Sequence, residues 1–137
     1  MSNGIERKKG INHIGIAVKS LKEAGERFSR IVGEGGHEEA VSGEGVKTLI
    51  FEEHRIELLE PVSEGSAIAK FIEKRGEGLH HIAITVDNIE KKVEELRAQG
   101  FVFTAEKPSI GAGGKKVIFI HPKSANGVLI ELVEERE

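Results

Sequence analysis

Cysteine is absent from this sequence of 137 residues, and no apolar run approaches the length of a membrane-spanning helix. Without thiols the chain can form no disulfide, no thiolate nucleophile and no cysteine-ligated zinc site, which suits a reducing compartment. The first ten residues, MSNGIERKKG, lack the apolar core of a signal peptide. These absences predict a soluble, cytoplasmic protein with no membrane partner.

An excess of charge of one sign is also missing. The 20 basic and 23 acidic residues leave a formal net charge of -3. Binding to nucleic acid through its phosphates needs a positive field, which this balance does not supply. We therefore expect no nucleic-acid partner. The length is that of one compact unit, so residues 1–137 are predicted to form a single domain.

A short strand-like motif occurs twice. INHIGIAV, which begins at Ile11, matches GLHHIAITV, which begins at Gly78, and this match places His81 on His13. Side chains alternate between the two faces of a strand, so in each copy one face is apolar and the other carries the histidine followed by small residues. The apolar face is expected to pack against a helix, and the histidine face to line a ligand site.

A second motif repeats in the same order. HRIELLEP matches VLIELVE near the carboxyl end, which places Glu131 on Glu57. Two aligned pairs in register indicate an internal duplication. We therefore predict an α+β fold in which two tandem βαβββ modules form a curved sheet around a metal cavity.

The first module is expected over about 11–61 and the second over about 78–134. Between them, within about 62–77, a connector helix begins after Ser66 and ends at Gly76. The remaining expected strands are 37–41, 46–51, 54–61, 101–105, 116–121 and 127–133.

Each module also has a helix with a recognisable start. In the first module Ser20 and Glu23 form a capping box, helical spacing of apolar residues follows, and Gly33 ends the helix. In the second module Asp87 and Glu90 form the same box.

Each module thus offers one histidine and one glutamate for a shared site. Two imidazoles and two carboxylates suit a divalent ion of borderline hardness such as Co, Ni, Mn or Zn, and coordination positions left open indicate catalysis. A lone histidine in a strand is usually packed or exposed, and a lone glutamate is usually solvated. The repeated register favours the metal interpretation for the four residues His13, Glu57, His81 and Glu131.

Three longer stretches then identify a family. SAIAKFIEKRGEGLHHIAI, IGAGGKKVIFIHPKSANGVLIEL and HRIELLEP resemble methylmalonyl-CoA epimerases of the vicinal oxygen chelate superfamily, over nearly the whole chain. The resemblance implies a glyoxalase-like fold and epimerisation at C2 of methylmalonyl-CoA through a metal-chelated enolate. It also implies an acyl-CoA substrate, a homodimer, and a divalent metal, with Co first and Ni, Mn, Zn or Mg as other choices.

The family mechanism uses two bases on opposite faces of C2. By the resemblance Glu131 is both a metal ligand and one base. The second family base lies in a loop with the pattern Glu-Gln-Gly-Val, where this chain has Gly43-Glu44-Gly45-Val46. Glu44 is our choice for this role. The alternatives are Glu38 or Glu39, a mechanism with one base, and a merely solvated Glu44.

A glycine-rich segment precedes two lysines in the second module. Gly113 and Gly114 could surround the acyl group with backbone N–H donors, while Lys115 and Lys116 would lie near the CoA phosphates. The spacing is neither that of a P-loop nor that of a dinucleotide fingerprint. The alternative is a hairpin loop with solvated lysines.

Other functions compatible with the same residues are a glyoxalase I-type lactoylglutathione lyase and a metal-free small-molecule binding protein of this fold. An extradiol dioxygenase is disfavoured, because its iron needs only two histidines and one carboxylate. Three other histidines have no repeated partner on the face that lines the site, and we predict that they are structural or exposed. They are His37, His54 and His80.

Overall fold

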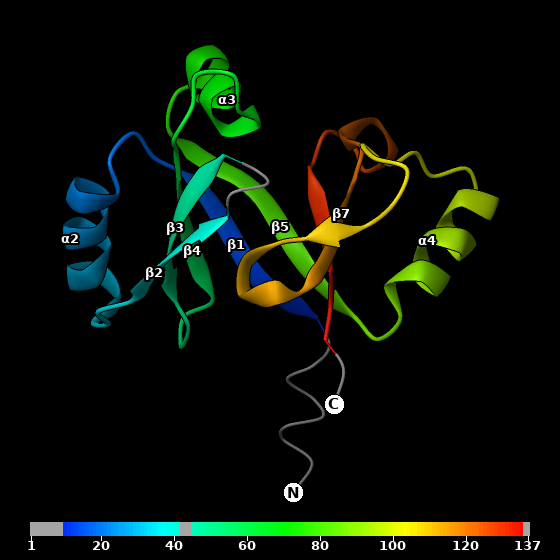
Figure 1. Ribbon diagram of the computed structural model, residues 1–137, viewed down its shortest axis with the longest axis horizontal. Helices are drawn as coiled ribbons and strands as arrows, with labels where there is room; N and C mark the ends of the chain where they lie inside the picture. Colours follow the sequence, from blue (N-terminus) through cyan, green and yellow to red (C-terminus); the bar gives the residue numbers. More distant parts are fainter. Residues whose placement is uncertain (1–9, 42–44, 136–137) are drawn as a thin grey trace, which may run out of the picture. The chain divides into compact units, whose positions relative to one another are not determined.

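The computed structural model describes residues 10–41 and 45–135 (Figure 1). Within these residues there are two compact units, one of residues 14–80 and the other of residues 10–13 together with 81–135. Strands β1 (Ile11–Ala17) and β5 (Gly78–Val86) contribute residues to both units.

The unit of residues 14–80 contains a sheet with the order β2-β3-β4-β1. Its neighbours pair antiparallel, except for the parallel pair of β4 and β1. The elements besides β1 are α2 (Leu21–Val32), β2 (His37–Val41), β3 (Val46–Phe51), β4 (Ile56–Pro61) and α3 (Ala67–Arg75).

Helix α2 has the ends that the sequence predicts. The Ser20 side chain accepts a hydrogen bond from the Glu23 backbone N–H at 3.1 Å, and Gly33 ends the helix in the left-handed conformation with φ 73°. The apolar side of α2 covers one face of the sheet (Figure 1). The buried residues of this core are Val18, Leu21, Ala24, Leu49, Phe51 and Leu58. The predicted helix and its covered strand face are confirmed.

The connector helix α3 is confirmed as well. Ser66 accepts a hydrogen bond from the Ala69 backbone N–H at 3.1 Å, and Gly76 follows the last turn. Ile68 anchors the helix, since it is buried while most of its neighbours in α3 are not.

In the other unit the sheet has the order β5-β8-β7-β6, and the Thr85 backbone N–H of β5 donates to Gly10 just before β1. The elements that follow β5 are α4 (Ile89–Ala98), β6 (Ser109–Ile110), β7 (Lys116–Ile120) and β8 (Ile130–Glu134), with short 3-10 turns at Ala112–Gly114 and Pro122–Ser124. Helix α4 packs on the sheet through a core of Ile89, Val93, Ile118, Ile120 and Leu132.

Three predictions for the second module were wrong in detail. The cap of α4 is Asn88 rather than Asp87, because Asn88 has the extended backbone of a cap and its side chain accepts from the Lys91 N–H at 3.1 Å. Residues 101–105 form no strand, since only Phe103 makes an isolated bridge, to Ile120. The segment still lies beside the end of β7, since the Thr104 N–H donates to Phe119 O at 2.9 Å and the His121 N–H to Val102 O at 2.8 Å, while the regular ladder on this side of β7 is formed by the two-residue strand β6.

The last strand begins at Ile130 rather than at Gly127. A 3-10 turn and the following turn occupy the preceding residues, where both Asn126 and Gly127 have positive φ and the Gly127 N–H donates to Pro122. The predicted Asn126-Gly127 turn is therefore present, but the strand starts after two further residues.

The two modules repeat the same strand register. In the parallel pair β1–β4, Gly15 lies opposite Glu57. In the parallel pair β5–β8, Ala83 lies opposite Glu131. Each module has the element order βαβββ. The predicted α+β class and the two tandem modules are confirmed.

Within the described residues, none of the helices is both long enough and apolar enough to cross a membrane.

Candidate metal centre

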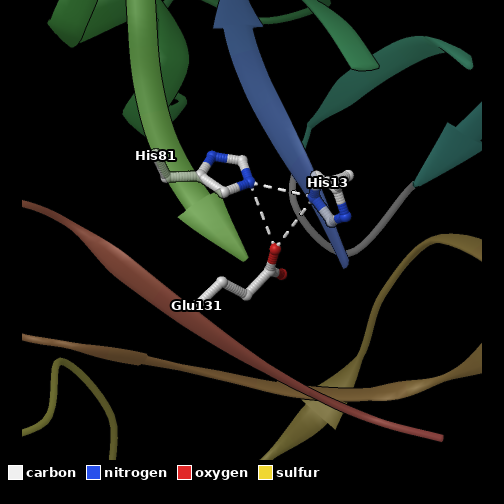
Figure 2. Close-up of side chains that lie close together, drawn as sticks. All are labelled: His13, His81 and Glu131. Carbon is white, nitrogen blue, oxygen red and sulfur yellow. Dashed lines mark hydrogen bonds and ion pairs between the residues drawn. The ribbon is translucent and has the colours of Figure 1, made fainter. Parts of the chain in front are cut away.

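Three of the four predicted ligands meet in one place. His13 comes from β1, His81 from β5 and Glu131 from β8, and all three belong to the unit of residues 10–13 and 81–135 (Figure 2). Each is at most 7% exposed. Buried polar groups need partners, and these three provide them for one another.

Three ligand atoms face one another at the centre of the group (Figure 2). His13 Nε2 and His81 Nε2 are 3.1 Å apart, and Glu131 Oε1 lies 3.3 Å from the first and 3.1 Å from the second. Ligands of one ion at about 2.1 Å lie about 3.0–3.4 Å from each other in octahedral or tetrahedral geometry. The spacing and the donor types therefore fit a single divalent ion.

The charge state of Glu131 suits this role. Burial alone raises the pKa of the Glu131 carboxyl, but hydrogen bonds and the charges of His13 and His81 outweigh it and lower this pKa to about 2. The carboxyl group is consequently an anion at neutral pH, the form in which it ligates metals.

One phenyl ring packs against the group. The Phe119 ring contacts the His81 ring edge to face at 5.4 Å between centroids, and the two histidine rings meet in the same manner at 5.2 Å. Phe119 lies directly opposite Glu131 in the pair β7–β8.

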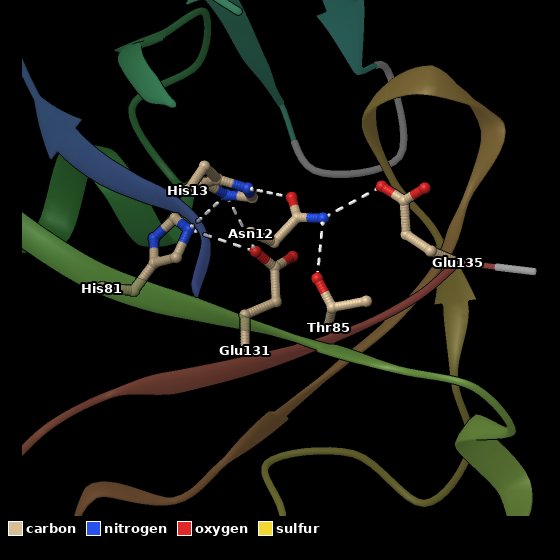
Figure 3. A network of polar contacts seen from close by, with 6 residues as sticks. All are labelled: Asn12, His13, His81, Thr85, Glu131 and Glu135. Carbon is tan, nitrogen blue, oxygen red and sulfur yellow. Dashed lines mark hydrogen bonds and ion pairs between the residues drawn. The ribbon is translucent and has the colours of Figure 1, made fainter. Parts of the chain in front are cut away.

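A polar network continues behind His13 (Figure 3). His13 Nδ1 lies 2.8 Å from Asn12 Oδ1. The Asn12 amide donates to Glu135 Oε2 at 3.0 Å and to Thr85 Oγ1 at 3.3 Å, and Lys115 Nζ donates to the same Glu135 oxygen. Sequence reasoning did not assign a role to Asn12, Thr85 or Glu135; the available signals were that Asn12 directly precedes His13 and that strand alternation puts Thr85 on the same face as His81.

Comparison with known proteins shows the family to which the chain belongs. Residues 12–119 match the model of the Glyoxalase/Bleomycin resistance protein/Dioxygenase superfamily. The chain belongs to this superfamily. The predicted glyoxalase-like fold is thereby confirmed.

Several relatives within the superfamily carry the same activity in their names. The ethylmalonyl-CoA/methylmalonyl-CoA epimerase of Cereibacter sphaeroides is 41% identical, over 89% of this chain and 95% of its own. The crystal structure of methylmalonyl-CoA epimerase from Mycobacterium tuberculosis is 37% identical with a TM-score of 0.86, over 93% and 89%. A Streptomyces coelicolor methylmalonyl-CoA epimerase variant in complex with 2-nitronate-propionyl-CoA is 32% identical with a TM-score of 0.87, over 94% and 99%.

The fourth predicted ligand, Glu57, lies on β4 in the unit of residues 14–80 and is partly buried. Its register relative to β1 is the same as that of Glu131 relative to β5. Its role as a metal ligand stays a prediction.

The predicted second base, Glu44, lies outside the described residues, as does Gly43. The alternatives Glu38 and Glu39 lie on β2, where Glu38 is exposed and Glu39 partly exposed. The choice among them stays a prediction.

The glycine loop of the second module forms a compact turn. Gly113 and Gly114 both have positive φ, and the Gly111 N–H donates to Lys115 O at 2.8 Å. Lys115 pairs with Glu135, while Lys116 Nζ donates to Glu90 of α4 at 2.8 Å. Both lysines are thus engaged by carboxylates, and a role in CoA binding requires a phosphate to compete with these carboxylates.

Two of the remaining histidines have structural contacts. His54 Nδ1 lies 2.9 Å from Glu34 Oε1 beside the β3–β4 turn. The His80 ring packs edge to face on Phe71 of α3. These contacts agree with the prediction that neither belongs to the metal centre.

Proposed function

We propose that this chain catalyses the epimerisation of methylmalonyl-CoA at C2, by way of an enolate and with the help of a divalent metal ion. The observation that carries this proposal is the buried group of His13, His81 and Glu131, found in a chain whose relatives are named as epimerases of this substrate. When bound, the ion supplies Lewis acidity that stabilises negative charge on the thioester and carboxylate oxygens of the substrate.

The residues of the chain orient the substrate and transfer the proton at C2. The hydrogen on C2 lies between two carbonyl groups, and its removal leaves a planar anion. The ligand named for the Streptomyces coelicolor structure, 2-nitronate-propionyl-CoA, is a planar anion of the same kind, which supports this chemistry. Glu131 on one face of C2 and Glu44 on the other are the proposed bases, each worth about 10²–10⁴ in rate.

We also propose Glu57 as the fourth ligand, because its register repeats that of Glu131. Two imidazole nitrogens and two carboxylate oxygens suit Co, our first choice, as well as Ni, Mn or Zn, and Mg less well. Backbone N–H groups of Gly113 and Gly114 would bind the acyl portion, with Lys115 and Lys116 near the CoA phosphates.

We also propose that the chain forms a homodimer and that it is located in the cytoplasm. Sedimentation velocity of the metal-loaded chain tests the dimer directly, since a monomer of 14.9 kDa and a dimer differ twofold in mass. A single species at the monomer mass over micromolar concentrations would reject it.

A stereochemical assay tests the activity. A single epimer of methylmalonyl-CoA is incubated with protein loaded with Co, Ni, Mn, Zn or Mg, and the appearance of the other epimer is followed. We expect conversion by the wild type and by His54→Ala, a matched control at an exposed histidine, and a loss of at least about a hundredfold in His13→Ala. Absence of conversion with all five metals would reject the proposal.

The superfamily also includes glyoxalases, so a lactoylglutathione lyase is the second candidate. The hemithioacetal of glutathione and methylglyoxal is therefore assayed in parallel. Turnover of the hemithioacetal without epimerisation would assign the metal centre to that reaction. Failure of both assays in a chain that takes up no metal would favour a small-molecule binding protein.

A further inference from the structure

We infer that Asn12 is a positioning residue for the metal centre. It holds the His13 ring in the tautomer whose Nε2 lone pair faces the ion, and Glu135 fixes the direction in which the Asn12 amide points. The inference rests on the metal centre proposed above and adds residues to it that do not touch the ion.

Asn12 contacts the ring of His13 through its side-chain oxygen. Asn12 Oδ1 lies 2.8 Å from His13 Nδ1, and an amide oxygen can only accept a hydrogen bond. Nδ1 must therefore carry the hydrogen. In its neutral form, the form that binds a metal, an imidazole has a single N–H, so Nε2 then keeps its lone pair for the ion. Nε2 is the atom that faces His81 and Glu131 (Figure 2).

The shape of the Asn12 amide does not set its direction, because its oxygen and nitrogen ends are nearly alike. Its nitrogen donates to Glu135 Oε2 at 3.0 Å and to Thr85 Oγ1 at 3.3 Å (Figure 3). A carboxylate accepts only, so the reversed amide would place two oxygens 3.0 Å apart. The reversed amide would also present its N–H₂ group to His13. Glu135 thus decides which end of the amide His13 meets.

Lys115 holds the Glu135 carboxylate in place. Lys115 Nζ donates to the same Oε2 atom that accepts from Asn12. A chain of contacts therefore runs from Lys115, next to the glycine loop, through Glu135 and Asn12 to His13. Residues that orient a metal-binding histidine in this way are typically worth 10–100-fold in metal affinity.

The two modules differ at this position. The residue that the repeat aligns with Asn12 is His80, which has no side-chain amide and whose ring packs edge to face on Phe71. Of the two copies of the motif, only the first therefore has an asparagine directly before its metal-binding histidine.

The test combines three variants with a control. Asn12→Leu keeps the approximate size and removes both polar ends. Asn12→Asp places a carboxylate against Glu135, and adding Glu135→Gln to it exchanges the two groups, so that the new amide at position 135 donates and the new carboxylate at position 12 accepts. Asn88→Ala is the control, because it removes an asparagine contact at the start of α4, away from the metal centre.

Two readouts are measured. The first is the tautomer of His13 in the metal-free protein at alkaline pH, where an imidazole is neutral, from ¹⁵N–¹H correlation spectra of the ring. The second is the affinity for Zn and Co, from competition with a chelator. We expect an Nδ1–H ring in the wild type and in Asn88→Ala. Asn12→Leu should lose this preference and bind metal about 10–100-fold more weakly.

The exchanged pair gives the decisive comparison. Asn12→Asp with Glu135→Gln should keep the Nδ1–H ring, because a carboxylate at position 12 still accepts from His13, and should bind metal more tightly than Asn12→Asp alone, because the two carboxylates no longer face each other. Wild-type affinity in Asn12→Leu, an Nε2–H ring in the wild type, or no gain from the exchange would each overturn the inference. If the wild type binds no metal, the proposed centre fails, whereas the tautomer readout still decides the role of Asn12.

Discussion

The two modules keep the same register at the histidine and glutamate strands but differ in what surrounds them. Gly15 opposes Glu57 in one module and Ala83 opposes Glu131 in the other. The duplication has thus preserved the register of the parallel strand pair in each module. This register sets the spacing of the proposed ligands. The neighbours of those ligands were free to diverge.

The divergence is largest at the outer strands. In the first module β2 pairs with β3 over five residues, from His37 to Val41, whereas in the second β6 has only two residues. The chain before β6 instead packs Phe101 and Phe103 into the core and leads into the glycine loop. A shorter ladder leaves a loop next to the metal centre, where Lys115 reaches Glu135.

The largest effect is expected from the repeated histidines. His81→Ala and His13→Ala should each lower the affinity for Co or Zn by at least about a hundredfold, because each removes a ligand of the same ion. His80→Ala, next to it, should stay within about threefold. Chelator competition measures all three, and equal losses in His80→Ala and His81→Ala would refute the ligand assignment.

The next prediction asks whether the glutamates are equivalent. If register defines the role, Glu57→Gln and Glu131→Gln should weaken metal binding by similar factors, because each removes one carboxylate ligand. Glu60→Gln is the control, as its carboxylate accepts from the Leu21 N–H at the start of α2. Wild-type metal affinity in Glu57→Gln would show that the repeated register does not make it a ligand.

A third prediction concerns packing in the first module. A Cβ at Gly25 of α2 would lie 2.7 Å from Leu49 Cδ2, so the Leu49 side chain must shift at a cost of about 1–3 kcal/mol, which the helix propensity of alanine offsets by about 1 kcal/mol; Gly25→Ala should therefore lower the free energy of unfolding by up to about 2 kcal/mol. Urea denaturation measures this loss. At Gly35 an added Cβ meets no atom within 4 Å, so Gly35→Ala serves as the control. Equal stability of the two variants would contradict the close packing of α2 on β3.

The smallest effect is expected at the helix starts. Ser20→Ala and Asn88→Ala should each cost about 1 kcal/mol, because each removes a side-chain oxygen that accepts a backbone N–H. Asp87→Ala should cost less than Asn88→Ala in urea denaturation. The reverse order would restore Asp87 as the cap of α4.

Sequence alone predicted the features that depend on local chemistry. Ser20 and Gly33 mark the ends of α2 because caps act within a few residues of themselves. The histidine register followed from strand alternation. The cap of α4 was misplaced because Asp87 and Asn88 are both good caps in adjacent positions, and only the backbone conformation decides between them.

The remaining features depend on contacts between distant residues. Asn12 and Glu135 are 123 positions apart, and nothing in the local sequence pairs them. Residues 101–105 alternate in the manner of a strand, but they form only an isolated bridge from Phe103 to Ile120 while Phe101 and Phe103 pack into the core around α4, and the regular ladder of β6 with β7 lies further along the chain. Such choices are made by tertiary packing, which overrides local propensity.

The most direct test of the account is the exchange of the C2 hydrogen of methylmalonyl-CoA in D₂O, followed by NMR with and without metal. We expect metal-dependent exchange coupled to epimerisation in the wild type. In Glu44→Gln one epimer should still exchange while conversion to the other is lost, because one face keeps its base. No exchange with Co, Ni, Mn, Zn or Mg would contradict the account.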